Sequence, residues 1–297
     1  MNVTDATIVA ADDNAQDSSA QPAILRPRHG FLKFLLVCGL LVTLAILTVN
    51  VVMLTRQFEQ TSSRSREHLF YVVCDEQSSA DERASAFLKL VRLGHLEWRS
   101  ALLSKTDLGG SIVSNASLNF IAITDADLRK ADFSNCDMHG ANLALSDATD
   151  ANLGEVILTE GNLFKTVLNK ADLRSANLSG ASLSQATVHE ANLVLADLTE
   201  CDLLMTDLAG SSLAGANLTG ANLEAAILTD CNLALARFDG TILVDTDFTD
   251  SNWWRARGLT GEQQLDLTAK YPPSSKDEQR LNDFELWLNS DEKPTDE

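Results

Sequence analysis

The chain has 297 residues and is acidic, with 23 Lys and Arg against 42 Asp and Glu, a formal net charge of −19 and a sequence pI of about 4.5. An acidic surface repels nucleic acid phosphates and anionic lipids, which argues against direct nucleic acid binding and favours a basic partner or divalent cations. Solubility alone is the simpler explanation of the charge.

The N-terminal part predicts a tail followed by a membrane anchor. Residues 1–25 contain no Lys or Arg and are rich in Ala, Asp, Ser and Gln, so we assign 1–30 as a disordered acidic tail. Residues 34–54 carry no charge, and at about 1.5 Å per residue they would cross about 30 Å of hydrocarbon. We therefore predict a single transmembrane helix within 31–55 that contacts the lipid bilayer through 34–54. A cleaved signal peptide is the alternative, but its apolar core would be shorter, and no small-x-small cleavage site follows.

Basic residues stand on both sides of this segment, so the positive-inside rule nearly ties. Arg26, Arg28 and Lys33 precede it, and Arg56, Arg64 and Arg66 follow. The first set lies slightly closer, which favours a short cytoplasmic tail with the rest of the chain outside the cytoplasm.

Residues 56–95 are predicted to form a tether and a capping helix. Ser79 and Glu82 have the spacing of a capping box, and Gly94 is a suitable stop. Ala84, Phe87, Leu88 and Val91 recur at helical spacing between them. We expect this helix to cover the end of the domain that follows, although a partner-binding helix is the alternative.

From Thr106 to Arg255 the sequence divides into 30 lines of five residues without an insertion, as in Ala126-Asp-Leu128-Arg-Lys and Ala216-Asn-Leu218-Thr-Gly. The middle residue of every line is apolar. The residue two positions earlier is small, except at Ile121 and Val156. A period of five fits neither a helix nor a plain strand, but it fits a chain that turns a corner every five residues with two side chains inward.

The pattern A-(D/N)-L-x-x resembles the pentapeptide-repeat family. The resemblance implies an all-β solenoid, a right-handed quadrilateral β-helix with four lines per coil. Trp98, Ala101 and Leu103 continue the register backwards, so we place the β-helix at 96–255 and expect about eight coils, with capping α-helices at both ends. In this arrangement each coil buries its apolar residues only against its neighbours.

Residues 256–297 are predicted to form C-terminal capping helices and an acidic tail. Thr260 and Gln263 would form a second capping box, before a short helix that covers the last coil with Leu265 and Leu267. A final helix would start in the segment Ser275-Lys-Asp-Glu278. Its face is made of Leu281, Phe284, Trp287 and Leu288. This face would either fold back on the rod or pair with a second copy, and the family resemblance implies that a homodimer through the C-terminal helices can form.

No set of residues predicts catalysis, a cofactor or a metal, so we expect a protein that is not an enzyme. There is no nucleophile elbow, zincin motif, P-loop or paired C-x-x-C. Cys136, Cys201 and Cys231 occupy the small corner position, and only Cys74 is expected to be exposed. His139 and His189 differ by two and a half coils and would lie on opposite faces.

Two outward patterns follow from a coil of 20 residues. Asp107, Asp127 and Asp147 should stack in one column, with Asp207 and Asp247 further along, which favours a bound cation or raised pKa values. The second pattern is apolar, and we predict that it forms the surface for a protein partner. Its members are Leu145, Phe164, Leu204, Met205 and Val244. The opposite corner has a weaker set, Val194, Leu195, Leu235 and Trp254, and scattered exposed apolar residues are the simpler explanation of both.

Together these features predict a membrane-anchored scaffold that presents a rigid acidic surface to an unidentified protein. The alternative comes from the quinolone-resistance members of the family: a DNA-mimic regulator that binds a topoisomerase or another DNA-binding protein. That alternative requires the rod to face the cytoplasm.

Overall fold

The computed structural model describes residues 40, 47–54, 56, 64–94, 97–98, 101–274 and 277–290, in two compact units, Met1–Thr61 and Ser62–Glu297. In the first unit, residues 47–54 are helical. The predicted acidic tail and most of the predicted transmembrane helix lie outside the described residues. Within the described part of the chain, no helix combines the length and apolar character needed to cross a bilayer.

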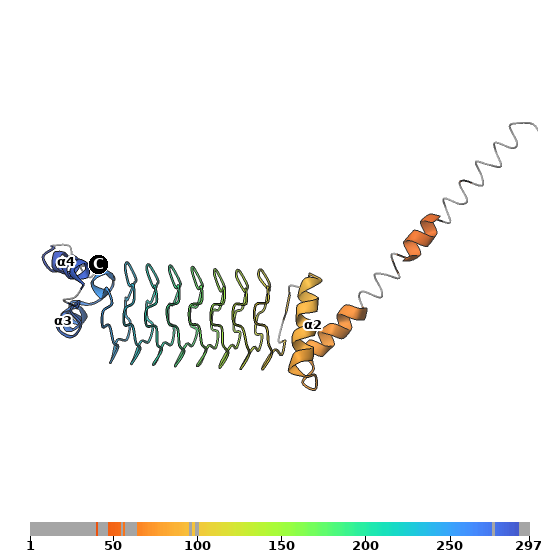
Figure 1. Ribbon diagram of the computed structural model, residues 1–297, viewed down its shortest axis with the longest axis horizontal. Helices are drawn as coiled ribbons and strands as arrows, with labels where there is room; N and C mark the ends of the chain where they lie inside the picture. Colours follow the sequence, from red (N-terminus) through yellow and green to blue (C-terminus); the bar gives the residue numbers. More distant parts are fainter. Residues whose placement is uncertain are drawn as a thin grey trace, which may run out of the picture. The chain divides into compact units, whose positions relative to one another are not determined.

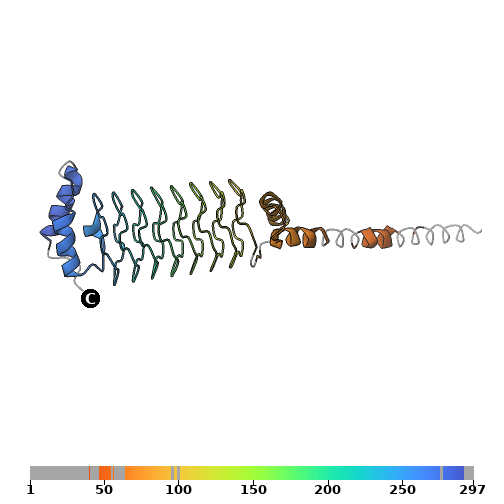
Figure 2. The same cartoon turned by 90° about the horizontal axis from the view of Figure 1, so that it is seen from below.

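The second unit is built on a stack of coils. Parallel bridges join residues that are 20 positions apart, from Glu97 with Ser117 through to Arg237 with Arg257. This spacing confirms four lines of five residues per coil, and eight such steps separate Glu97 from Arg257. The pairing consists of isolated bridges rather than continuous strands. Figures 1 and 2 show the coils stacked in a row, with α2 at one end and α3 and α4 at the other.

Each line ends in a tight turn. The N–H of the small residue donates to the carbonyl of the apolar residue three positions earlier, as from Ala176 to Leu173 at 3.1 Å. The residue just before the small one has a positive φ, such as 57° at Glu200 and 70° at Gly220. A positive φ at the third residue of a four-residue turn is the mark of a type II turn.

The preference for Asp or Asn in the second position of a line has a backbone cause. The N–H of the fourth residue has no carbonyl within reach, and the side-chain oxygen of the second residue accepts it. Ser179 N donates to Asn177 Oδ1 at 3.1 Å, and Thr149 N donates to Asp147 Oδ1 at 3.0 Å. The Asp or Asn side chain thus completes the hydrogen bonding of the coil.

The inward side chains form one continuous core along the coils. From Leu103 to Trp253 every apolar middle residue is buried except Leu243, which is partly exposed. Ile121 and Val156, the two large corner residues, are also fully buried. Most buried polar corner residues donate to the carbonyl 23 positions earlier. Examples are Thr166 Oγ1 to Leu143 O at 3.0 Å and Cys136 Sγ to Val113 O at 3.3 Å. Thr106, Thr241 and Ser251 instead donate to the carbonyl three positions earlier.

The N-terminal end of the coils is covered by helices. Helix α2 spans Ala80–Arg92 and begins with the predicted Ser79–Glu82 capping box, and Gly94 follows its end with a φ of +77°. Phe87 of α2 packs on Trp98 with ring centroids 4.6 Å apart. The segment predicted as a tether is partly helical, because residues 64–74 form a helix whose Val73 carbonyl accepts from Leu102 N at 3.4 Å.

The C-terminal end is covered by η1 (Trp253–Arg255), α3 (Gly261–Lys270) and α4 (Glu278–Leu288). The Thr260–Gln263 capping box of α3 is confirmed. Leu267 is buried as predicted, but the prediction for Leu265 is wrong because α3 turns that side chain outward, where it is 75% exposed.

Helix α4 folds back onto the coils. Its N-cap is Asp277, within the segment predicted to start it. Phe284 is buried, with its ring 5.1 Å from that of Trp254 and 5.9 Å from that of Trp253. Of the other predicted face residues, Leu281 and Trp287 are partly buried, and Leu288 is exposed.

Candidate interaction surface

The five predicted surface residues, which we call the apolar corner, lie along one corner of the stack. Hydrogen bonds join this corner from coil to coil: Leu145 N donates to Phe164 O at 3.0 Å, and Ala225 N donates to Val244 O at 2.8 Å. Leu145, Met205 and Val244 are each 56% exposed, and Phe164 and Leu204 are partly exposed.

The apolar corner is an interrupted row. Phe164, Leu204 and Val244 are 40 residues apart, so two coils, or about 10 Å, separate each from the next. The intervening coils carry Ser184 with Gln185 and Glu224 with Ala225 at these positions. Lys165 lies over the ring of Phe164, with Nζ 5.2 Å from the centroid, so a cation already covers part of that ring.

Two residues of the apolar corner have an energetically unfavourable backbone conformation. Leu145 and Met205 have φ values of 66° and 55°. A left-handed conformation costs an L-residue roughly 1–2 kcal/mol, and Gly210 and Gly220 avoid that cost at the equivalent turn position. Neither Leu145 nor Met205 gains burial in return, so the core does not explain their presence.

The acidic column is also in place but holds its own cation. Bridges join Asp107 to Asp127 and Asp127 to Asp147, as the period predicts. Arg129 Nε donates to Asp127 Oδ1 at 2.9 Å and lies 4.0 Å from Asp147 Oδ2. These contacts lower the pKa of Asp127, so the expected raised pKa is wrong for this residue. The described residues include no cluster of His, Cys, Asp or Glu that could hold a metal ion.

The histidines and cysteines do not converge on a site. His139 Nδ1 lies 2.8 Å from Thr159 Oγ1, and His189 Nε2 lies 2.7 Å from Asp207 Oδ2, in a different column. Cys136, Cys201 and Cys231 are buried as predicted, and desolvation raises the pKa of Cys201 and Cys231 to about 12 and that of Cys136 to about 11. Such thiols are poor nucleophiles at neutral pH. Cys74, expected to be exposed, is partly buried, and this raises its pKa.

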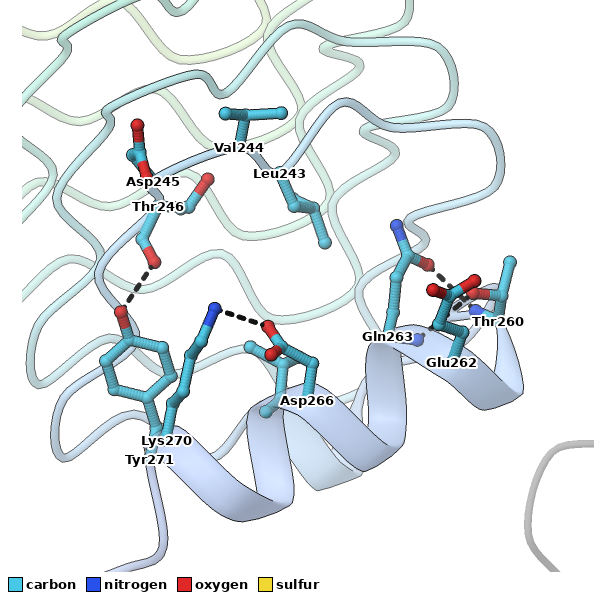
Figure 3. A pocket seen from close by; sticks show the side chains of 11 residues that line it. Leu243, Val244, Asp245, Thr246, Thr260, Glu262, Gln263, Asp266, Lys270 and Tyr271 are labelled. Atoms are coloured by element: carbon cyan, nitrogen blue, oxygen red, sulfur yellow. Dashed lines mark hydrogen bonds and ion pairs between the residues drawn. The ribbon is translucent and has the colours of Figure 1, made fainter.

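A groove that the sequence did not predict lies between the last coil and α3 (Figure 3). We call it the end groove; it has a volume of about 830 Å³ and is lined by 243–246 and by residues of 260–271. Leu243 points into it, and Tyr271 closes one end by donating its hydroxyl to Thr246 O at 3.0 Å. Val244 belongs to both the end groove and the apolar corner. One signal was available in the sequence: Gln263, one coil after Leu243, is polar and cannot cover it.

A family model for pentapeptide repeats matches this chain in eight copies between residues 101 and 252, just over half of its length. The chain belongs to the pentapeptide-repeat family. The fold of this family is the right-handed quadrilateral β-helix, in agreement with the 20-residue bridge spacing. A search of curated protein sequences finds no significant match.

Several solved pentapeptide-repeat structures are similar to the chain. HetL, involved in heterocyst differentiation regulation in the cyanobacterium Nostoc, is 28% identical over 56% of this chain and 95% of its own, with a TM-score of 0.23. Full-length QnrB1, a plasmid-mediated fluoroquinolone resistance protein, is 15% identical over 58% and 98%, with a TM-score of 0.24. A protein of the Arabidopsis thaliana thylakoid lumen is 19% identical over 62% and 89%, with a TM-score of 0.17. The family assignment rests on the repeat, not on these superpositions.

Proposed function

We propose that this pentapeptide-repeat protein is a non-catalytic, membrane-anchored scaffold whose apolar corner binds another protein. The observation that carries the proposal is that five apolar side chains gather on one corner, with Leu145 and Met205 exposed at turn positions where they gain no burial. Leu195 and Leu235 are exposed in the same way on the opposite corner, so that corner provides the control. The coils are held by hydrogen bonds at nearly every position, so the corner is preorganised and binding would cost little ordering entropy.

Substitution of two corner residues tests the proposal. Phe164→Asp with Leu204→Asp should lower partner capture from a detergent extract by roughly tenfold or more, because apolar anchors dominate interface energy. Val194→Asp with Ala214→Asp adds the same charge at the same line position on the opposite corner and should leave capture unchanged. Equal capture by both double variants would contradict a role for the apolar corner.

The alternative is a DNA-mimic regulator that binds a topoisomerase or another DNA-binding protein. The acidic rod supports it, since residues 106–255 contain 7 Lys and Arg against 21 Asp and Glu. The DNA-mimic alternative requires the rod to lie in the cytoplasm. The anchored scaffold is instead proposed to place the rod outside the cytoplasm, with residues 34–54 in the membrane.

Reporters fused after Glu297 separate the two proposals. We expect a reporter that is active only outside the cytoplasm to work, which would exclude contact with DNA enzymes. Activity of a cytoplasmic reporter instead would contradict the proposed orientation and lead to a topoisomerase binding assay.

A further inference from the structure

The coils are joined by a regular ladder that stops at the end groove. On this side of the stack, one line uses three backbone groups to bind the next. Ala221 O accepts from Ile242 N at 3.0 Å, Leu223 N donates to Ile242 O at 2.9 Å, and Ala225 N donates to Val244 O at 2.8 Å.

One coil later the equivalent three groups are open. Thr241 O, Leu243 N and Asp245 N make no hydrogen bond to any described residue, because the chain continues into α3 instead of another line. They therefore form an unpaired parallel edge, in which Leu243 and Asp245 line the end groove and Thr241 is buried next to them; an unpaired edge is a template for an added strand.

The side chains below this edge are also incompletely covered. Leu223 and Leu203, at the same position in the preceding coils, are fully buried, whereas Leu243 is partly exposed. Leu267 of α3 also lines the groove, and Figure 3 shows the space between that helix and the last coil. An apolar side chain bound at this point would cover Leu243 in the way that the apolar residue of one more coil would.

The rim of the end groove is acidic. Asp245, Glu262 and Asp266 line it, against a single Lys270, whose ammonium is held by Asp266 at 2.9 Å. An incoming segment therefore meets two carboxylates, those of Asp245 and Glu262, that are not ion-paired with a described residue. A cationic segment complements this rim, and an anionic one is repelled.

We propose that the end groove binds an extended, cationic peptide segment of a partner protein, which adds a parallel line to the last coil. The segment places a small residue over Thr241 and an apolar residue, two positions later, over Leu243, with Lys or Arg at the outward positions. This site deepens the proposed scaffold function and rests on it, but its recognition mode differs from that of the apolar corner, so the two can fail separately.

The test is a titration of the full-length chain, in mild detergent, with the fluorescent peptide Lys-Arg-Ala-Arg-Leu-Lys-Arg-Lys. In the proposed register, the N–H of the Arg between Ala and Leu donates to Thr241 O. Methylation of that nitrogen keeps every charge and side chain but removes the donor. We expect saturable binding of the parent peptide and at least about tenfold weaker binding of the methylated one, since a lost hydrogen bond and a steric clash act together.

Protein variants test the rim. Asp245→Lys with Glu262→Lys should weaken binding by about tenfold. The matched control is Asp125→Lys with Glu278→Lys: Asp125 has the same φ of 55° in an early coil, and Glu278 lies in the first turn of α4 as Glu262 does in α3. The control should bind as tightly as the unmodified chain.

Hydrogen exchange supplies a readout specific to strand addition. At saturating peptide, the amides of Leu243 and Asp245 should exchange at least about tenfold more slowly, while that of Val244 changes less.

Equal binding of the two peptides, equal binding by the rim and control variants, or unchanged exchange at Leu243 would overturn the proposal. Protection of these amides without peptide, in a concentration-dependent dimer, would also overturn it by assigning the edge to a second copy. The Phe164 and Leu204 variants should bind the peptide normally, which keeps this result separate from partner capture.

Discussion

The side-chain oxygen at the second position of each line is a structural acceptor before it is a surface charge. Asp and Asn alternate freely there because either can accept the N–H of the residue two positions later, as Asp147 and Asn177 do. Much of the acidity of the rod is therefore compatible with a structural origin. The apolar corner differs, because nothing in the coil requires Leu145 or Met205.

This role predicts the effect of removing one acceptor. Asn177→Ala should lower the free energy of unfolding by about 1 kcal/mol, because Ser179 N loses its partner. Thr187→Ala is the matched control: Thr187 has the same position in its line, but His189 N donates to Asn169 instead. It should change stability by less than about 0.5 kcal/mol. Urea unfolding followed by circular dichroism measures both, and equal destabilisation would show that the side-chain acceptor is not the cause.

At the scale of elements, the coils and helix starts were predictable because their signals are local. A five-residue period fixes inward and outward positions, and the capping boxes at Ser79 and Thr260 mark where helices begin. The exposure of Leu265 and the opening at Leu243 were not predictable in the same way. Both depend on how the axis of α3 crosses the last coil, which is a tertiary property; the polar Gln263, one coil after Leu243, is the one local sign of the opening.

One acidic residue of α4, Asp283, accepts two side-chain hydrogen bonds from the end of the coils. Asp283 accepts from Trp254 Nε1 at 2.8 Å and from Arg255 Nε at 2.8 Å, while Arg280 donates to Asp250 O. Asp283→Ala should weaken docking by about 1–2 kcal/mol, less than for a buried pair because Arg255 is half exposed.

Tryptophan fluorescence and amide exchange in α4 report this change, since Trp253 and Trp254 pack on Phe284. Glu285→Ala is the control on the same helix, because the Glu285 side chain is exposed and forms no ion pair with a described residue. An α4 that stays equally protected in both variants would show that the aromatic contacts suffice.

At the scale of the whole molecule, the coil period links sequence distance to direction. Residues 20 apart share a face, and residues 10 apart lie on opposite faces. The residues of the apolar corner therefore share one face only if the number of residues between them changes by whole coils of 20. Stability depends mainly on contacts between neighbouring coils. The face on which later residues lie can therefore be changed while the packing of the core is kept.

Two deletions, of a whole coil and of half a coil, test whether the apolar residues must share one face. Removing residues 171–190 takes out one coil and brings Phe164 about 5 Å closer to Leu204 on the same corner. Removing residues 171–180 takes out half a coil and moves Leu204 and Met205 to the corner opposite Leu145 and Phe164. Both join Lys170 to an Ala at the start of a line, so both should fold with similar circular dichroism. The half-coil deletion also brings Val194, Leu195 and Leu235 onto the corner of Leu145 and Phe164, so both deletions carry Ser at these three positions. Partner capture should survive the coil deletion and fall roughly tenfold or more with the half-coil deletion, because only the latter divides the apolar anchors between two faces. Equal capture by the two deletions would mean that the partner contacts a single coil or the end groove alone. It would contradict binding along a continuous apolar corner.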